Sequence, residues 1–357
     1  MNRPHPLCGH GFGVALTTPF TADDAVDTAA LQRLTRHVTD GGADFVVALG
    51  STGEAAMLDA RERDLVVAAV RAHCGRAKLV VGTGASSTAQ ASAWTRRAKD
   101  LGADGALVTV PPYTKPTQAG IEAHFERVAA AAPELPLIVY NVPSRVGADL
   151  QPATLAKLWR LPTVCAVKEA SGDLRQITRI ANELPPDRLL LAGDDALLLP
   201  TIAVGGHGVV SVAGNVAPHA MRALVDACRS SQLALAQRRA RALTPLFDAL
   251  SLEPNPIPIK AALAELGFGA AAPRLPLLPA TDATRRALQH ARQVADMVGI
   301  HMAEPDPSQV FRIHRVFQRV HPGIAQHGEA RIDEHRLRPL EQEAVDGKRS
   351  EPRHRQP

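Results

Sequence analysis

Eight short apolar runs, separated by helical patterns, constrain this sequence more than any other feature. Segments such as LDARERDLVVAAVRAHC (58–74) and TQAGIEAHFERVAAAA (117–132) repeat apolar residues at helical spacing. Near-continuous apolar strands indicate a parallel sheet that is buried on both faces. Eight β/α units within about 230 residues favour a closed (β/α)8 TIM barrel of the α/β class over an open doubly wound sheet. The expected strands span residues 13–20, 45–50, 78–84, 105–112, 135–142, 163–170, 188–195 and 208–215.

The barrel is expected to occupy residues 11–230 of the 357-residue chain, after an N-terminal extension at residues 1–10. Further helical patterns, ending in TDATRRALQHARQVADMVG, predict a small C-terminal helical region at 231–299. Residues 300–357 are polar and lack a sustained amphipathic pattern, so we expect a disordered tail there.

Composition points to small-molecule chemistry in the cytoplasm. A formal charge of +4 is small for this length, and the basic residues lack aromatic partners, which argues against a nucleic-acid surface. The N-terminus lacks the apolar core of a signal peptide, and no run is long enough to span a membrane. The four cysteines are far apart and lack the spacing of a disulfide framework or a zinc site. They are Cys8, Cys74, Cys165 and Cys228.

A lysine ends the sixth apolar run, TVCAVKEASG (163–172). Lys168 could simply be the first solvated residue after a strand. Alternatively, low-dielectric surroundings disfavour the charged form of an amine, which frees its lone pair for attack on a carbonyl group. Its neighbours must decide between these readings.

Barrel enzymes place their chemistry where the strands end, and the residues that follow the runs form a coherent set here. Tyr113 and Tyr140 are the two tyrosines of the chain, and both fall at this rim together with Lys168. This coincidence strengthens the case for a catalytic role of the lysine, and both interpretations stay open at this point. The rim segments are GSTGE (50–54), PPYTKP (111–116), YNVPSRVG (140–147), GDD (193–195) and GGHGVVSV (205–212).

These motifs resemble the dihydrodipicolinate synthase family, which belongs to the pyruvate-dependent class I aldolase and lyase superfamily. GSTGE and the Lys168 strand are shared with relatives such as N-acetylneuraminate lyase, whereas YNVPSR, KEASG and NPIPIK (255–260) point to the synthase family itself. The resemblance covers roughly residues 11–295. It implies condensation of pyruvate with L-aspartate 4-semialdehyde to 4-hydroxy-tetrahydrodipicolinate, the committed step of lysine and diaminopimelate biosynthesis, without a cofactor.

By this resemblance, Lys168 would form a Schiff base with pyruvate, which then loses a methyl proton to become an enamine. Tyr140 would be the general acid/base, and Ser51 and Tyr113 would complete a hydroxyl relay. The family usually has threonine in place of Ser51, but the hydroxyl is retained. Tyr113 in family members reaches into the neighbouring subunit's site, which implies a homodimer, commonly paired into a tetramer.

The resemblance also implies binding roles. Thr52, with the backbone N–H groups of its turn, would hold the pyruvate carboxylate, and Arg145 would bind the carboxylate of the semialdehyde. Gly193 and Val210 match positions where backbone lines the site. Asp194 and Asp195 invite a metal reading, but no further ligands cluster nearby, so capping and hydrogen bonding are favoured and no metal is expected.

Feedback-inhibited family members bind lysine through histidine, asparagine, glutamate and tyrosine side chains. The matching positions here are Ala60, Ser86, Gln90 and Pro112, which predicts an enzyme insensitive to lysine. Two other functions stay open. One is a sister aldolase or dehydratase acting on a 2-keto-3-deoxy sugar acid or on 4-hydroxy-2-oxoglutarate, against which Arg145 argues. The other is a catalytically silent binding paralogue.

Overall fold

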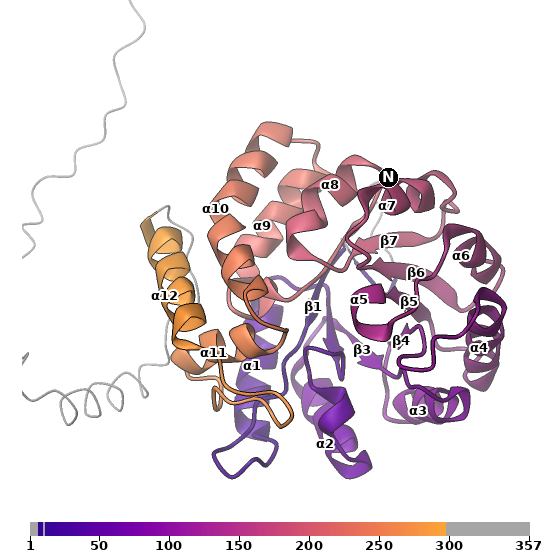
Figure 1. Cartoon of the computed structure of the whole chain (residues 1–357), viewed down its shortest axis with the longest axis horizontal. Helices are drawn as coiled ribbons and strands as arrows, with labels where there is room; N and C mark the ends of the chain where they lie inside the picture. Colours follow the sequence, from indigo (N-terminus) through magenta and orange to yellow (C-terminus); the bar gives the residue numbers. More distant parts are fainter. Residues whose placement is uncertain (1–5, 10, 298–357) are drawn as a thin grey trace, which may run out of the picture. The chain divides into compact units, whose positions relative to one another are not determined.

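Eight parallel strands close into a barrel in the computed structural model, which describes residues 6–9 and 11–297 (Figure 1). β1 pairs with β2 on one side and with β8 on the other, so that Gly13 lies opposite both Phe45 and Val210. The predicted fold class is confirmed. The strands are β1 (Phe12–Ala15), β2 (Phe45–Ala48), β3 (Lys78–Gly82), β4 (Gly105–Thr109), β5 (Leu137–Asn141), β6 (Val164–Glu169), β7 (Leu189–Ala192) and β8 (Gly208–Ser211).

Helices follow the strands in alternation and surround the barrel (Figure 1). They are α1 (Thr28–Asp40), α2 (Ala60–His73), α3 (Thr88–Asp100), α4 (Gln118–Ala131), α5 (Pro143–Val146), α6 (Pro152–Leu158), α7 (Leu174–Asn182), α8 (Leu198–Ala203) and α9 (Pro218–Arg229). Three short 3-10 helices lie at the rim: η1 (Ala55–Met57), η2 (Asp195–Leu197) and η3 (Ala213–Asn215).

The helix α4 shows how the sequence pattern produces these elements. Thr117 caps the helix by accepting a hydrogen bond from the backbone N–H of Gly120. Ile121, Phe125 and Val128 recur at helical spacing and are fully buried against the barrel wall. The helix therefore begins at a capping signal and buries the face that the periodicity predicts.

The strands end earlier than the apolar runs that predicted them. The run at 208–215 forms β8 only as far as Ser211, and residues 213–215 form η3 instead. A parallel barrel strand must stop where the chain turns outward to its helix, although the residues beyond that point can stay buried and apolar. Buried residues therefore continue past the hydrogen-bonded ladder. The apolar sequence pattern follows burial, so it predicts strands that are longer than the ladder.

Three further helices follow the barrel: α10 (Leu233–Ser251), α11 (Ile257–Glu265) and α12 (Asp282–Met297). Their apolar residues share one buried cluster with β1, β2 and the neighbouring helices α1, α2 and α9. Leu7 and Cys8, within the predicted N-terminal extension, are buried in a second cluster around β4 to β7. The domain boundaries at residues 10 and 230 stay predictions. The predicted disordered tail at 300–357 lies outside the described residues.

Residues 6–9 and 11–297 contain no candidate membrane-spanning helix. None of the helices there combines the length and apolar character that a crossing requires.

Two histidines with buried Nε2 atoms should make the fold sensitive to mild acid. Burial lowers the pKa of His124 and of His37 to about 4, and the Nε2 atoms of both are buried without a partner in the described part of the chain. Each folded pKa lies below the unfolded value, so the stability that each ring contributes is present at neutral pH and is lost as pH falls from about 6.5 to about 4. We expect each histidine to cost about 2 kcal/mol at pH 5 relative to pH 8. Urea unfolding of a His124→Gln variant should show a smaller loss over this interval, and an equal loss would contradict the prediction.

Candidate functional site

Lys168 and Tyr140 lie next to each other on the inner wall of the barrel. They are partners in the parallel ladder between β5 and β6. The Nζ atom of Lys168 lies 4.3 Å from the centroid of the Tyr140 ring, and the lysine is only 4% exposed. The amine is therefore held in low-dielectric surroundings against a phenol, as an imine-forming lysine with a general acid/base would require.

A cavity of about 350 Å³ opens above this pair. Six of the eight predicted site residues line it: Ser51, Thr52, Tyr140, Arg145, Lys168 and Gly193. Gly193 has a steric reason to be glycine, because a Cβ atom there would lie 3.2 Å from Cε of Lys168 and 2.5 Å from Cβ of Ala170. The absence of this side chain leaves room for the amine.

Thr52 and Arg145, the two predicted carboxylate-binding residues, both contact Asn255, to which the sequence assigned no role. The side chain of Asn255 donates to Oγ1 of Thr52 over 2.8 Å, while Nη2 of Arg145 donates to the carbonyl oxygen of Asn255 over 2.8 Å. Asn255 also lines the cavity. The signal for it was the NPIPIK motif, which begins at Asn255, but nothing in the sequence indicated that this segment returns to the barrel mouth.

Two of the predicted residues do not line the cavity. Tyr113 lies on the loop after β4 with a positive φ of 72°, and its side chain is 90% exposed. It is not brought to Tyr140 or Ser51 within this chain. Val210 is fully buried in β8, within the apolar core.

The two aspartates that follow β7 make hydrogen bonds of the kind expected. Asp194 caps η2 by accepting from the N–H of Ala196, and Asp195 accepts from the N–H groups of Val212 and Ala213. Burial raises the pKa of Asp195. Within the described residues, no group of three or more histidine, cysteine or acidic side chains is arranged to hold a metal ion.

A polar network supports Tyr140 and Lys168 from outside the barrel wall. Asn141 follows Tyr140 and Glu169 follows Lys168 by one position, so their side chains point to the opposite face. The Asn141 amide donates to Glu169 and, over 2.8 Å, to Asp149. Burial raises the pKa of the Glu169 carboxyl group, which also accepts from the N–H of Ser171. These contacts tie the ends of β5 and β6 together, and the apolar pattern of the strands gave no sign of them.

A second cavity of about 620 Å³ adjoins the first and shares Ser51, Tyr140 and Arg145 with it. Its lining includes three of the four positions matched to lysine binding: Ser86, Gln90 and Pro112. The fourth, Ala60, lies on α2 outside it. Arg63 lines the cavity, lies 3.8 Å over the Trp94 ring and donates to two backbone carbonyl groups. Among the residues that the structure describes, this cavity is lined by arginine side chains and by no carboxylate.

The fold and the site define an enzyme of the Schiff-base-forming lyase class, built on a (β/α)8 barrel. The model of the dihydrodipicolinate synthetase family matches residues 10–295. A 4-hydroxy-tetrahydrodipicolinate synthase from Prochlorococcus marinus (strain MIT 9313) is 45% identical over 277 residues, which cover 77% of this chain and 92% of that one. The chain belongs to the dihydrodipicolinate synthetase family.

Solved structures agree with this assignment. The dihydrodipicolinate synthase of Cyanidioschyzon merolae with lysine bound is 37% identical, with a TM-score of 0.78 over 81% of this chain and 99% of that chain. A chloride-inhibited dihydrodipicolinate synthase from Acinetobacter baumannii, complexed with pyruvate, is 36% identical, with a TM-score of 0.78 over 82% of this chain and 99% of that chain.

Proposed function

We propose that this enzyme condenses pyruvate with L-aspartate 4-semialdehyde to 4-hydroxy-tetrahydrodipicolinate, with Lys168 as the imine-forming residue. The observation that carries the proposal is the buried Lys168 amine over the Tyr140 ring, in one cavity with Thr52 and Arg145. Two sites suited to carboxylates thus flank one amine, as two acidic substrates would need. Curated relatives named 4-hydroxy-tetrahydrodipicolinate synthase support this activity, and nothing in the comparisons favours a sugar-acid aldolase or a silent paralogue.

The reaction balances without a cofactor. The neutral Lys168 amine attacks C2 of pyruvate, and the carbinolamine loses water, with Tyr140 supplying the proton to the departing hydroxyl group. The methyl group then loses a proton to the Tyr140 phenolate to give the enamine, whose carbon bonds to the aldehyde carbon while the aldehyde oxygen takes up that proton and becomes the hydroxyl group. The amino group of the semialdehyde finally attacks C2, closes the ring and displaces Lys168. One water molecule is released overall.

Thr52 and Arg145 each bind the carboxylate of a different substrate. The turn at Ser51 and Thr52 presents hydroxyl and N–H groups close to Lys168, which suits the pyruvate carboxylate. Arg145, held at the cavity mouth by its contact with Asn255, suits the semialdehyde carboxylate. Ser51 and Tyr140 carry protons at the reacting atoms, and Gly193 forms part of the cavity wall.

Borohydride trapping tests the proposal directly. Reduction in the presence of pyruvate should add one pyruvate-derived mass to the peptide that contains Lys168, because only the imine is reducible. Omission of pyruvate is the control. An unmodified Lys168 peptide, or labelling of Lys260 instead, would overturn the mechanism. A coupled assay with aspartate semialdehyde then distinguishes this activity from that of a sister aldolase.

Arg145→Ala should separate the two substrates. The variant should still form the pyruvate adduct, but its efficiency with aspartate semialdehyde should fall at least about tenfold, since a charge-assisted contact contributes on the order of 1.5 to 3 kcal/mol. Arg145→Lys keeps the charge without the planar fork and should recover only part of the loss. Equal losses in pyruvate trapping and in turnover would assign Arg145 a structural role instead.

Lysine should not inhibit this enzyme. A ligand ammonium group would meet Gln90 in place of a carboxylate, Pro112 offers no hydroxyl group, and Arg63 adds a positive charge to the same cavity. Contacts worth about 1 kcal/mol each would be missing, so binding should weaken by orders of magnitude. Initial rates at saturating pyruvate should stay flat as lysine is raised to millimolar levels. Clear partial inhibition there would show that the assumed pocket is wrong.

We further place the enzyme in the cytoplasm as a homodimer or homotetramer. The four cysteines are buried, and Cys74, Cys165 and Cys228 form no disulfide within the described residues, which suits a reducing compartment. Tyr113 is exposed on a loop, and both Tyr113 and Lys115 have positive φ. Such strained backbone conformations persist where other contacts hold them, and they cluster at functional sites. Insertion of Tyr113 into a partner subunit's site would supply a contact that holds this loop. Sedimentation analysis that finds a monomer at micromolar concentration would contradict this assembly.

A further inference from the structure

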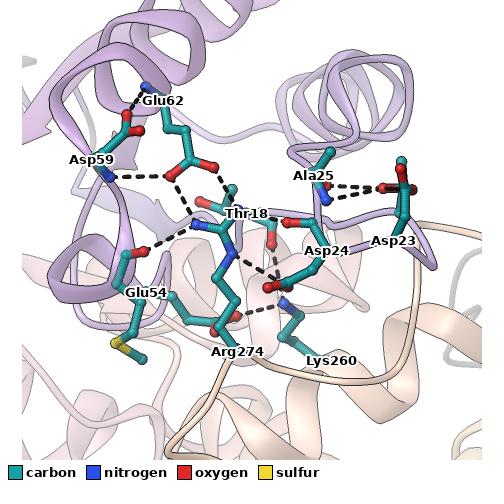
Figure 2. A network of polar contacts seen from close by, with 11 residues as sticks. Thr18, Asp23, Asp24, Ala25, Glu54, Asp59, Glu62, Lys260 and Arg274 are labelled. Atoms are coloured by element: carbon teal, nitrogen blue, oxygen red, sulfur yellow. Dashed lines mark hydrogen bonds and ion pairs between the residues drawn. The ribbon is translucent and has the colours of Figure 1, made fainter.

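A second lysine is buried in the described part of the chain, and the reaction does not use it. Lys260, on α11, is 2% exposed and does not line the substrate cavity. Its Nζ atom donates to Oε1 of Glu54 over 2.5 Å and to the carbonyl oxygen of Thr18 over 3.2 Å (Figure 2). The same atom lies 3.9 Å from the centroid of the Phe20 ring. The amine is thus fully engaged by an anion, a carbonyl group and an aromatic face.

Glu54 is equally well satisfied. Its second carboxylate oxygen accepts from the backbone N–H of Arg274 over 2.8 Å, and its side chain is fully buried. Removing two charges from water costs several kcal/mol for each, so a buried pair by itself is weak evidence of added stability. Fixing one arrangement of the chain is a better-attested role for such a pair.

The arrangement fixed here is the turn that carries Ser51 and Thr52. Glu54 ends this turn in the left-handed conformation, with φ of 55°, and Leu49 begins it with φ of 58°. Residues other than glycine adopt this conformation at a cost, and they keep it where surrounding contacts hold them. Thr18 supplies a further contact from behind, because its Oγ1 donates to the carbonyl oxygen of Gly53 over 2.7 Å.

The segment that contains Lys260 contacts the turn at a second point. Asn255, five positions before Lys260, donates to Oγ1 of Thr52. The segment that begins α11 therefore holds both the binding residue of the turn and the residue that ends it.

We propose that Lys260 is a positioning residue for pyruvate, acting through its ion pair with Glu54 to hold the Ser51 and Thr52 turn in its binding geometry. This inference rests on the proposed function of Lys168 and the turn, and it adds a residue outside the barrel strands to the determinants of pyruvate affinity. Burial lowers the pKa of the Lys260 amine, and the Glu54 carboxylate opposes this shift.

The test is a double variant, Lys260→Met with Glu54→Gln. It removes both charges together, so that no unpaired charge is left buried, and it keeps the length of both side chains. The pyruvate concentration that gives half-maximal borohydride labelling of Lys168 should rise at least about tenfold, since small displacements of a binding group are costly. The KM for aspartate semialdehyde should stay within about twofold of the wild-type value.

Arg274→Met is the matched control. The Arg274 side chain belongs to the same network, where it pairs with Glu62 and Asp24 (Figure 2), but only its backbone N–H contacts Glu54. The control should lose stability without changing half-saturation by pyruvate. If the double variant does not fold, Glu54→Asp takes its place, because it keeps the charges balanced and shortens the link to the turn. It should raise the same pyruvate concentration.

Unchanged pyruvate half-saturation in the folded double variant would overturn the inference, and so would equal losses for both substrates. Both results leave the proposed function intact, provided that wild-type Lys168 is labelled. Absence of labelling in the wild type would instead remove the proposed function, so the two failures are distinguishable.

Discussion

Lys168→Met is expected to reduce kcat/KM by at least about 10³-fold, because no other amine of the described residues lines the cavity and the covalent route is lost with it. Methionine nearly preserves the volume and the packing against the Tyr140 ring, so the fold should be unaffected. A coupled assay with both substrates measures the loss, and thermal unfolding checks the fold.

Lys168→Arg is the matched control for charge. It keeps a cation over the Tyr140 ring but cannot form an imine, because the guanidinium group stays protonated. It should be as inactive as Lys168→Met. Substantial activity in the arginine variant would mean that Lys168 contributes only electrostatically, which would contradict the Schiff-base mechanism.

Tyr140→Phe is expected to lower kcat by about 10² to 10⁴-fold, the usual contribution of a general acid or base. Phenylalanine retains the ring that packs against Lys168 and removes only the hydroxyl group. Borohydride labelling of Lys168 should still reach completion, although more slowly, since dehydration of the carbinolamine needs a proton. Rapid labelling with normal turnover would assign that proton to another group.

Much of the fold was predictable because barrel strands are buried on both faces. Val139 and Val167, on the outer wall, are as fully buried as Ile138 and Ala166, which face the other way. Continuous apolar runs record this double burial. The ends of the strands were not predictable, since burial continues into η3 after the ladder of β8 has ended.

The proximity of Tyr140 and Lys168 was predictable for a related reason. Residues at the carboxyl ends of neighbouring parallel strands must meet, and Tyr140 and Lys168 both follow long apolar stretches. Asn255 could not be placed in this way. It lies between α10 and α11, in a segment without strand or helix periodicity, and only tertiary packing brings it to Thr52. Tyr113 is a third case, because its expected site lies outside its own chain.

The order of these elements along the chain has a consequence for biosynthesis. All eight strands, and Lys168 with them, precede the segment from Asn255 to Arg274 that holds the carboxylate turn. On the ribosome, Lys168 is therefore synthesised well before Asn255, Lys260 and Arg274, whose contacts with Thr52 and Glu54 hold the turn. A nascent or prematurely terminated chain would present Lys168 to cellular keto acids without the contacts that retain pyruvate. Under the proposed function, a chain that ends before Asn255 is therefore expected to bind pyruvate more weakly than the complete fold.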